Sequence, residues 1–268
     1  MTLSRRDVSD LLARHGLRPS RALGQNFVAD PNTVRRIARL AEVGEGDQVV
    51  EIGAGLGSLT LALAETGASV VAVELDRYIT PVLRSVVEPV GVRVVEGDAM
   101  SLDWPALLGD RRWVLVANLP YNVATPLVLD LLDDVPQIRR MLVMVQREVG
   151  ERMAAGVGDE AYGAVSVKVA YWAHARVVGR VPATVFVPQP RVESALVSIE
   201  RRDAPAVDVD RARLFDLVRT GFGQRRKMLR RALAGVVDEA VFACAGVRPE
   251  ARAEELDIEA WGRLAACS

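Results

Sequence analysis

The architecture follows from Val49-Val50-Glu51-Ile52-Gly53-Ala54-Gly55-Leu56-Gly57. Residues 49–52 predict a buried strand, the glycines predict a tight loop, and residues 58–65 predict the start of a helix. This order is typical of the first unit of a doubly wound α/β sheet. Glycine suits the loop because a side chain would collide with a ligand laid across the end of the strand.

The spacing of the glycines separates this loop from a dinucleotide-binding loop. The dinucleotide pattern is G-x-G-x-x-G, whereas Ser58 stands here where the third glycine should be. No Lys or Arg lies nearby to meet a pyrophosphate. The loop therefore favours a nucleoside ligand without phosphates.

Polar residues also end the next three predicted strands. Glu74 ends the strand at 69–74, where an acidic side chain can accept hydrogen bonds from both ribose hydroxyls. Asp98 follows the next strand and offers an acceptor to an adenine amino group, and Asn118 follows the fourth. Because an open α/β sheet binds ligands at this edge, the ordered series is a stronger signal than the turn alone.

These features resemble the class I S-adenosylmethionine methyltransferases, and Asn118-Leu119-Pro120-Tyr121 resembles the tetrad of their adenine-N6 branch. Three further motifs narrow the resemblance to the ribosomal RNA adenine dimethyltransferases. They are Leu23-Gly24-Gln25-Asn26-Phe27, Phe186-x-Pro188-x-Pro190-x-Val192-x-Ser194 and Phe222-Gly223-Gln224-Arg225-Arg226-Lys227. The resemblance implies dimethylation of two adjacent adenosines near the 3′ end of the small-subunit (16S) rRNA, in a partly assembled small ribosomal subunit.

The resemblance also implies S-adenosyl-L-methionine as cofactor, with Asn26 and the backbone near Val28 closing over its methionine end. From the residues alone, Gln25 and Asn26 could instead be loop residues that cap their neighbours. The residues predicted to contact the cofactor are Asn26, Val28, Gly53, Gly55, Glu74, Asp98 and Asn118.

The tetrad suits an exocyclic amine. The N6 amine of adenine is a poor nucleophile because its lone pair is delocalised into the ring. The Asn118 side-chain oxygen and the Leu119 carbonyl are the predicted acceptors for its two hydrogens, and Pro120 fixes the backbone. Methyl transfer from a sulfonium then needs alignment more than a strong base.

Two aromatic residues are predicted to hold the target base. Tyr121 offers a ring for stacking, and Phe186, in a segment made rigid by prolines, is predicted to cover the opposite face. The alternative for Phe186 is a core residue beside two loop prolines.

The chain divides at residues 203–210, which are acidic, contain proline and lack hydrophobic periodicity. Strands and helices alternate before it, and the last strands, at 174–181 and 196–201, are expected to include an antiparallel strand at the sheet edge. Helices are predicted after it at 211–219, 227–234 and 238–245, with a final turn at Leu256 and Trp261. We predict a class I methyltransferase Rossmann-like domain at 1–202 and a small α-helical RNA-binding domain at 203–268.

The composition argues against a membrane protein, a secreted protein and a metalloprotein. The chain has 268 residues, 50% of them hydrophobic, but no run of 18 apolar residues and no signal peptide. We therefore expect a soluble cytoplasmic monomer without a membrane partner. Cys244 and Cys267 are judged too few for a disulfide framework or a thiolate site, and His15 and His174 are expected at the surface, so we predict no metal.

Five cations lie within seven residues: Arg225, Arg226, Lys227, Arg230 and Arg231. On a helix, Arg226 and Arg230 would be i,i+4 neighbours, and so would Lys227 and Arg231. Because no acid interrupts the run, it favours an RNA-phosphate partner over a plain solvated helix face. For the scattered arginines elsewhere, a coding preference for Arg over Lys is the favoured interpretation, and contact with phosphates is the alternative.

Three other functions fit parts of the sequence. A large-subunit rRNA adenine methyltransferase of the macrolide-resistance type shares the site motifs and differs in which RNA takes up methyl groups. A non-enzymatic RNA-binding assembly factor would have no use for Glu74, Asp98 and Asn118 together. A methyltransferase acting on glutamine is disfavoured by the basic segment.

Overall fold

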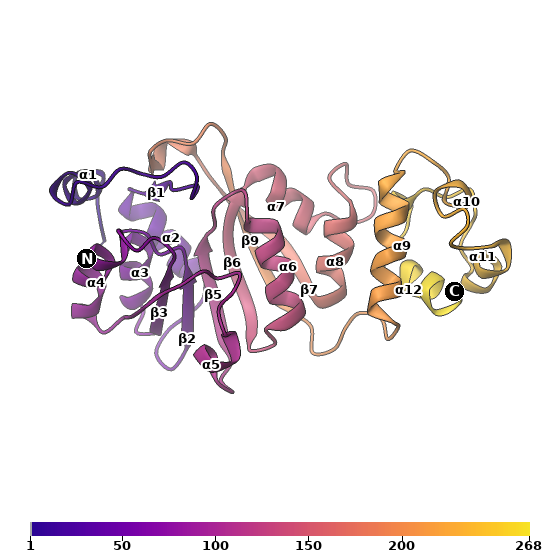
Figure 1. Cartoon of the computed structure of the whole chain (residues 1–268), viewed down its shortest axis with the longest axis horizontal. Coiled ribbons are helices and arrows are strands. Elements are labelled where there is room, and N and C mark those ends of the chain that lie inside the picture. Colours follow the sequence, from indigo (N-terminus) through magenta and orange to yellow (C-terminus); the bar gives the residue numbers. More distant parts are fainter. Residues whose placement is uncertain (1) are drawn as a thin grey trace. The chain divides into compact units, whose positions relative to one another are not determined.

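The centre of the fold is the strand that precedes the glycine turn. In the computed structural model, which describes residues 2–268, β2 (Gln48–Ile52) lies between β3 (Ser69–Glu74) and β5 (Trp113–Asn118), both parallel to it (Figure 1). The other strands of this sheet are β4 (Arg93–Glu96), β6 (Ile138–Gln146), β7 (Ala173–Val181) and β9 (Ser194–Arg201). Their order is β4-β3-β2-β5-β6-β9-β7, so the ends of β2 to β5 meet at one edge.

Helices alternate with these strands, which confirms the predicted α/β fold. The helices that precede the tetrad are α1 (Arg5–Arg14), α2 (Pro31–Leu40), α3 (Ser58–Ala64), α4 (Thr80–Val87) and α5 (Trp104–Leu108). The helix α6 (Ala124–Asp134) follows it. Within residues 2–268, no helix is both long enough and apolar enough to cross a membrane.

The start of α2 follows from local chemistry. The Asp30 carboxylate accepts a hydrogen bond from the Thr33 N–H at 2.9 Å, and Pro31 occupies the first turn, where no N–H is needed. Val34 and Ile37 are buried in one core with α3 and the sheet. This core fixes α3 and the glycine turn that precedes it.

The antiparallel strand lies one position inside the sheet edge. β9 pairs antiparallel with β6, from Arg140↔Glu200 to Gln146↔Ser194, while β7 takes the edge. One of the last two strands is antiparallel as expected, but this strand is β9, which lies next to the edge strand β7 and not at the edge itself. The physical reason is burial, because the run from Ala195 to Val197 is apolar and almost completely buried, as an interior strand requires.

A second, two-stranded sheet joins two motifs that are far apart in the chain. β1 (Phe27–Val28) pairs antiparallel with β8 (Phe186–Val187), with Val28 opposite Phe186. The Ala29 N–H continues the contact by donating to the Val185 carbonyl at 2.8 Å. The motif before the fold is thereby held by the motif that follows β7.

The chain divides into two compact units at points other than those predicted. The first unit runs to Gly150 and resumes at 177–200, and the second comprises 151–176 and 201–268. The predicted boundary at 202 assigned 151–176 to the methyltransferase domain. These residues belong with the C-terminal helices because Tyr162 and Tyr171 are buried in the core of the second unit.

The second unit is built around Trp261, which is fully buried. Its helices are α8 (Ala164–Trp172), α9 (Arg211–Gly223), α10 (Leu229–Ala232), α11 (Glu239–Ala245) and α12 (Ile258–Ala266), and α7 (Arg147–Ala154) leads into it. A Cβ added at Gly221 would lie 2.6 Å from the Trp261 ring, so the glycine in α9 leaves the space that the indole occupies. The predicted final turn is in fact the helix α12.

Cys244 and Cys267 form a disulfide that joins α11 to the end of α12, with 6.0 Å between the two Cα atoms. The sequence analysis judged the two cysteines too few for a disulfide framework, whereas the structure joins them in one bond across a separation of 23 residues. They meet because α11 and α12 pack against each other. Among residues 2–268, no three His, Cys, Asp or Glu side chains form a group suited to a metal ion.

Candidate active site

A cavity of about 210 Å³ opens where β2 to β5 end. Its walls are the glycine turn, the ends of the four strands, the tetrad and residues 23–28 of the segment of residues 20–28, which precedes and includes β1. Every residue predicted to contact the cofactor lines it, namely Asn26, Val28, Gly53, Gly55, Glu74, Asp98 and Asn118. Leu119, Pro120 and Tyr121 of the tetrad line it as well.

The glycine turn is shaped by contacts that exclude side chains. Gly53, Gly55 and Gly57 have positive φ angles of 72°, 58° and 90°. A Cβ at Gly55 would lie 2.9 Å from the Phe27 ring, and one at Gly57 would lie 2.7 Å from Val87 of α4. Gly55 therefore lets Phe27 pack on the turn, whereas Gly57 serves the packing of α3 against α4.

Glu74 is held in place by main-chain donors. Its Oε2 accepts from the Gly55 N–H at 2.8 Å and its Oε1 from the Asp76 N–H at 2.9 Å. The side chain is 6% exposed, and this burial raises its pKa. The carboxylate keeps further lone pairs, so it can accept hydrogen bonds from a ligand without moving.

Glu51 is a cavity residue that sequence reasoning did not single out. It is 2% exposed, and its Oε2 has no hydrogen-bond partner within the described chain. Burial raises the pKa of Glu51 to about 8, the negative charge of Glu74 adds to the rise, and the Thr60 hydroxyl opposes it. The signal in the sequence was an acidic residue inside the apolar run that precedes the glycines.

The outer wall of the cavity combines one acid with two exposed apolar side chains. Asp98 is exposed, and its Oδ1 accepts from the Met100 N–H at 2.9 Å. Leu75 and Met100 line the cavity although they are 49% and 44% exposed. Sequence reasoning missed both, and their signal was an apolar residue close behind each acidic strand end. Apolar side chains at a cavity wall suit contact with a flat ring.

The Asn118 amide has a defined orientation. Its Nδ2 donates to the main-chain carbonyl of Asn26 at 2.9 Å. A carbonyl can only accept, so the NH₂ end must face Asn26, and the side-chain oxygen is left for another donor. The neighbouring Leu119 N–H donates to the Met144 carbonyl at 3.0 Å, while the Leu119 carbonyl has no donor within residues 2–268.

Tyr121 and Phe186 have different environments. Tyr121 is half-buried at the cavity, and its hydroxyl lies 2.9 Å from the Ser194 hydroxyl, which is fully buried. Burial raises the pKa of Tyr121. Phe186 is 0% exposed in the core with α2 and α3. Its predicted place over the target base is therefore wrong for this structure, because its pairing opposite Val28 turns it into the core.

The basic segment of the second unit is not the predicted helix. Residues 225–227 form a turn and a bend, and only Leu229–Ala232 is helical. The N–H groups of Leu229 and Arg230 donate to the carbonyls of Ala251 and Pro249 at 2.7 and 3.0 Å. These long-range bonds replace a helical start, so the predicted i,i+4 cationic face does not form.

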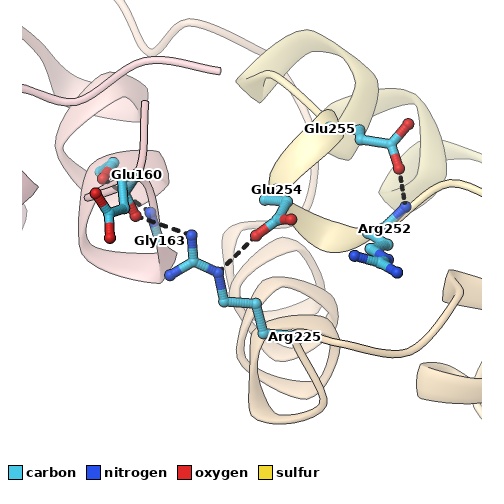
Figure 2. A network of polar contacts seen from close by, with 7 residues as sticks. Glu160, Gly163, Arg225, Arg252, Glu254 and Glu255 are labelled. Carbon is cyan, nitrogen blue, oxygen red and sulfur yellow. Dashed lines mark hydrogen bonds and ion pairs between the residues drawn. The ribbon is translucent and has the colours of Figure 1, made fainter. Parts of the chain in front are cut away.

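Two of the five cations are also compensated by acids from elsewhere in the second unit. Figure 2 shows Arg225, whose Nε lies 2.6 Å from Glu254 and whose Nη2 donates to the Glu160 carbonyl at 2.9 Å. Arg230 lies 3.3 Å from Glu250. The other three cations of this segment are exposed, and their side chains have no partner among residues 2–268. They are Arg226, Lys227 and Arg231.

The fold has solved counterparts. A dimethyladenosine transferase from Plasmodium falciparum superposes with a TM-score of 0.78 at 24% sequence identity, over 89% of this chain and 95% of that one. The 23S rRNA methyltransferase ErmE superposes with a TM-score of 0.71 at 25% identity, over 90% of this chain and 99% of that one. The sheet and helices described above are thus those of a class I methyltransferase.

Sequence comparison identifies the family. The family model described as Ribosomal RNA adenine dimethylase matches residues 17–267. The Ribosomal RNA small subunit methyltransferase A of Kineococcus radiotolerans is 48% identical, over 98% of this chain and 91% of the relative. The protein of the same name from Thermobifida fusca is 47% identical, over 97% and 93%. The chain therefore belongs to the ribosomal RNA adenine dimethylase family, whose members are methyltransferases.

Proposed function

We propose that this enzyme methylates the N6 amines of two adjacent adenosines near the 3′ end of small-subunit rRNA, with S-adenosyl-L-methionine as methyl donor. The names of its curated relatives support the small subunit as the source of the RNA. The cavity residues support the reaction type, as argued below. The enzyme would act on RNA within a partly assembled small ribosomal subunit.

The polar groups of the cavity fit a nucleoside with an amino-acid end. The Glu74 carboxylate, fixed by two amides, would accept from the ribose hydroxyls. Asp98 would accept from the adenine amine, with Leu75 and Met100 against the ring. The unpartnered oxygen of Glu51 suits an ammonium group, whose positive charge would favour the ionised carboxylate over the protonated form that burial alone favours.

The segment of residues 20–28 would complete the cofactor site, with Asn26 and the main chain at Val28 covering the amino-acid end. S-adenosylmethionine supplies a methyl group on a positively charged sulfur. Because the leaving group is neutral, the protein has to align the two reactants and exclude water rather than provide a strong base.

The tetrad would orient the target amine. The Asn118 side-chain oxygen points away from its Asn26 partner and accepts a hydrogen bond from one N6 hydrogen. The unpartnered Leu119 carbonyl accepts a hydrogen bond from the other. Two acceptors draw the amine toward tetrahedral geometry and expose its lone pair. Pro120 fixes the backbone directly after the Leu119 carbonyl and brings no N–H of its own.

Tyr121 would stack on the target base. Its hydroxyl is anchored to Ser194, so the ring is held at the cavity before the RNA arrives. Stacking of a base on an aromatic ring stabilises the complex by about 1 to 3 kcal/mol, which helps to hold an adenine out of its helix.

The basic segment would contact RNA phosphates. Arg226, Lys227 and Arg231 are the stronger candidates because they are exposed and unpaired among the described residues, whereas Arg225 and Arg230 are engaged with acids. Each cation that neutralises a phosphate adds a salt-dependent contribution to affinity.

The observation that carries the proposal is the fixed Asn118 amide beside the free Leu119 carbonyl. The test is transfer of radiolabelled methyl groups to small subunits from a strain that lacks this modification, with the modified bases mapped by primer-extension block. We expect Asn118→Ala to lower the rate by roughly 100-fold or more. Asn122→Ala is the matched control, since this exposed asparagine of the same loop does not line the cavity, and it should stay within about twofold.

The same assay, run in parallel with large subunits, tests an alternative that the likeness to a 23S rRNA methyltransferase raises. Label in large-subunit RNA, and none in small subunits, would favour the alternative substrate. Full activity of Asn118→Ala on either RNA would refute the mechanism.

A further inference from the structure

Asp76 connects two parts of the cavity that the proposed function treats separately. Its main-chain N–H donates to Glu74 Oε1 at 2.9 Å, which helps to fix the carboxylate at the ribose end. Its Oδ2 accepts from Gln25 Nε2 at 2.8 Å. Asp76 does not itself line the cavity, so it acts through these neighbours.

Gln25 is held at both ends of its amide. Its Oε1 accepts from the Ser20 N–H at 2.7 Å, and a backbone N–H can only donate, so the NH₂ end must face Asp76. Both side chains are partly buried. The bond therefore ties the segment of residues 20–28 to the loop that follows β3.

This segment reaches the tetrad at two points. The Asn26 carbonyl accepts the Asn118 amide at 2.9 Å, and a Cβ at Gly24 would lie 3.0 Å from the Pro120 side chain. Residues 20–26 have no helix or strand of their own, so their position depends on a few side-chain contacts. Gln25 makes the contact that lies next to Asn26.

We propose that Gln25 and Asp76 are positioning residues whose hydrogen bond holds the segment where the Asn26 carbonyl orients the Asn118 amide. The inference rests on the proposed function, because it assigns the bond an effect on the rate of methyl transfer. Loss of the bond lets the segment shift and the Asn118 oxygen turn away from the amine. Cofactor affinity also falls, because Asn26 and Val28 of the segment cover the amino-acid end. It falls less than the rate, because the Glu74 contacts with Gly55 and with the main chain of Asp76 remain.

Deleting Asp76 would give an ambiguous result. Its Oδ1 accepts from the Tyr78 N–H, and its carbonyl accepts from the Ile79 and Thr80 N–H groups that begin α4. An exchange of donor and acceptor avoids this difficulty. In Gln25→Glu combined with Asp76→Asn, the Asn NH₂ donates to the Glu carboxylate, the Asn oxygen still accepts from Tyr78, and the Glu still accepts from Ser20.

The experiment measures kcat for methyl transfer and the Kd of S-adenosylhomocysteine for each variant. Gln25→Glu sets two carboxylates against each other, and we expect kcat to fall by roughly 10- to 100-fold while Kd rises by a clearly smaller factor. Asp76→Asn alone should lower kcat less. The exchanged pair should recover to within about threefold of the wild type. Arg21→Ala, which shortens an exposed side chain of the same segment outside the cavity, is the control and should keep its kcat.

A second measurement separates positioning from general damage. In an Asn118→Ala background, Gln25→Glu should lower the residual kcat no further, because the effect passes through Asn118. Additive losses, an unchanged kcat in Gln25→Glu, or an exchanged pair that stays slow although folded would each overturn the proposal. Should Gln25→Glu fail to fold, Gln25→Met removes the donor without a charge, and an unchanged kcat there overturns it as well.

The outcome distinguishes this inference from the proposed function. If Asn118→Ala is inactive and Gln25→Glu is fully active, only the positioning role fails. If Asn118→Ala is fully active, the tetrad mechanism and the positioning role fail together.

Discussion

The cavity of the first unit and the basic segment of the second unit hold their charges in opposite ways. In the cavity, Glu51 and Glu74 are almost completely buried, and Glu74 is fixed by two main-chain amides. In the basic segment, Arg226, Lys227 and Arg231 are exposed and have no recorded partner among residues 2–268.

The difference teaches how the two kinds of ligand are recognised. Groups fixed before a small ligand arrives lose little freedom on binding, and removal of one leaves a buried partner unpaired. Exposed cations act on a polyanion through many weak, salt-screened contacts, so each can be lost with a modest effect. The two regions should therefore respond differently to substitution.

The largest effect on binding should come from Glu74→Gln. A glutamine has one acceptor oxygen, so either the Gly55 or the Asp76 N–H loses its partner and the ribose acceptor is lost as well. We expect the Kd of S-adenosylhomocysteine to rise by roughly 10- to 100-fold, measured by calorimetry. Glu96→Gln is the control, because Glu96 ends the next strand but does not line the cavity. Equal effects of both variants would contradict a fixed ribose site.

A smaller effect is expected when Arg226, Lys227 and Arg231 are all changed to Ala. RNA affinity at low salt should fall by roughly 10-fold, and the slope of log K against log salt should decrease by about two to three units. The double variant Arg225→Ala with Arg230→Ala should change the slope by less than about one unit, because these side chains are engaged with Glu254 and Glu250. Identical slopes for the two sets would remove the distinction between free and paired cations.

Tyr121→Phe and Ser194→Ala should each lower kcat/KM for RNA by about threefold to tenfold. Each removes one partner of the 2.9 Å contact that anchors the ring. The combined variant should lose little more than either single one, as shown by a double-mutant cycle in kcat/KM. A fully additive loss would show that the hydroxyl pair does not hold the ring.

A last effect concerns stability and pH, and not rate or affinity. Because burial raises the pKa of Glu51 to about 8 from 4.5, the folded chain holds this proton more tightly than the unfolded chain. This contribution to stability is complete below about pH 4.5 and is lost as pH rises through about 8. Melting temperatures from about pH 5 to about pH 9 should fall more steeply in the wild type than in Glu51→Gln. Parallel curves would show that Glu51 does not titrate in this range.

Local patterns were sufficient to predict the cavity because its parts lie at the ends of strands. Glu74, Asp98 and Asn118 each close an apolar run, and parallel strands bring such ends to one edge. Glu51 was missed because burial inside the sheet, and not sequence position, gives it a shifted pKa.

Long-range pairing decided the regions that were predicted wrongly. Phe186 turns inward because β8 pairs with β1, which lies far away in the sequence. The basic segment loses its helical start because the N–H groups of Leu229 and Arg230 bind carbonyls near residue 250. Neither partner can be identified from the pattern of the segment itself.

The second unit is encoded in two separate runs, 151–176 and 201–268. A gene that ends after codon 202 would keep Tyr162, Val167 and Tyr171 but lose the helices that bury them. The truncated product would then expose an apolar patch, which promotes aggregation with other chains. A premature stop codon there should therefore yield insoluble protein that is degraded in the cell, and not a soluble enzyme with lower affinity for its RNA.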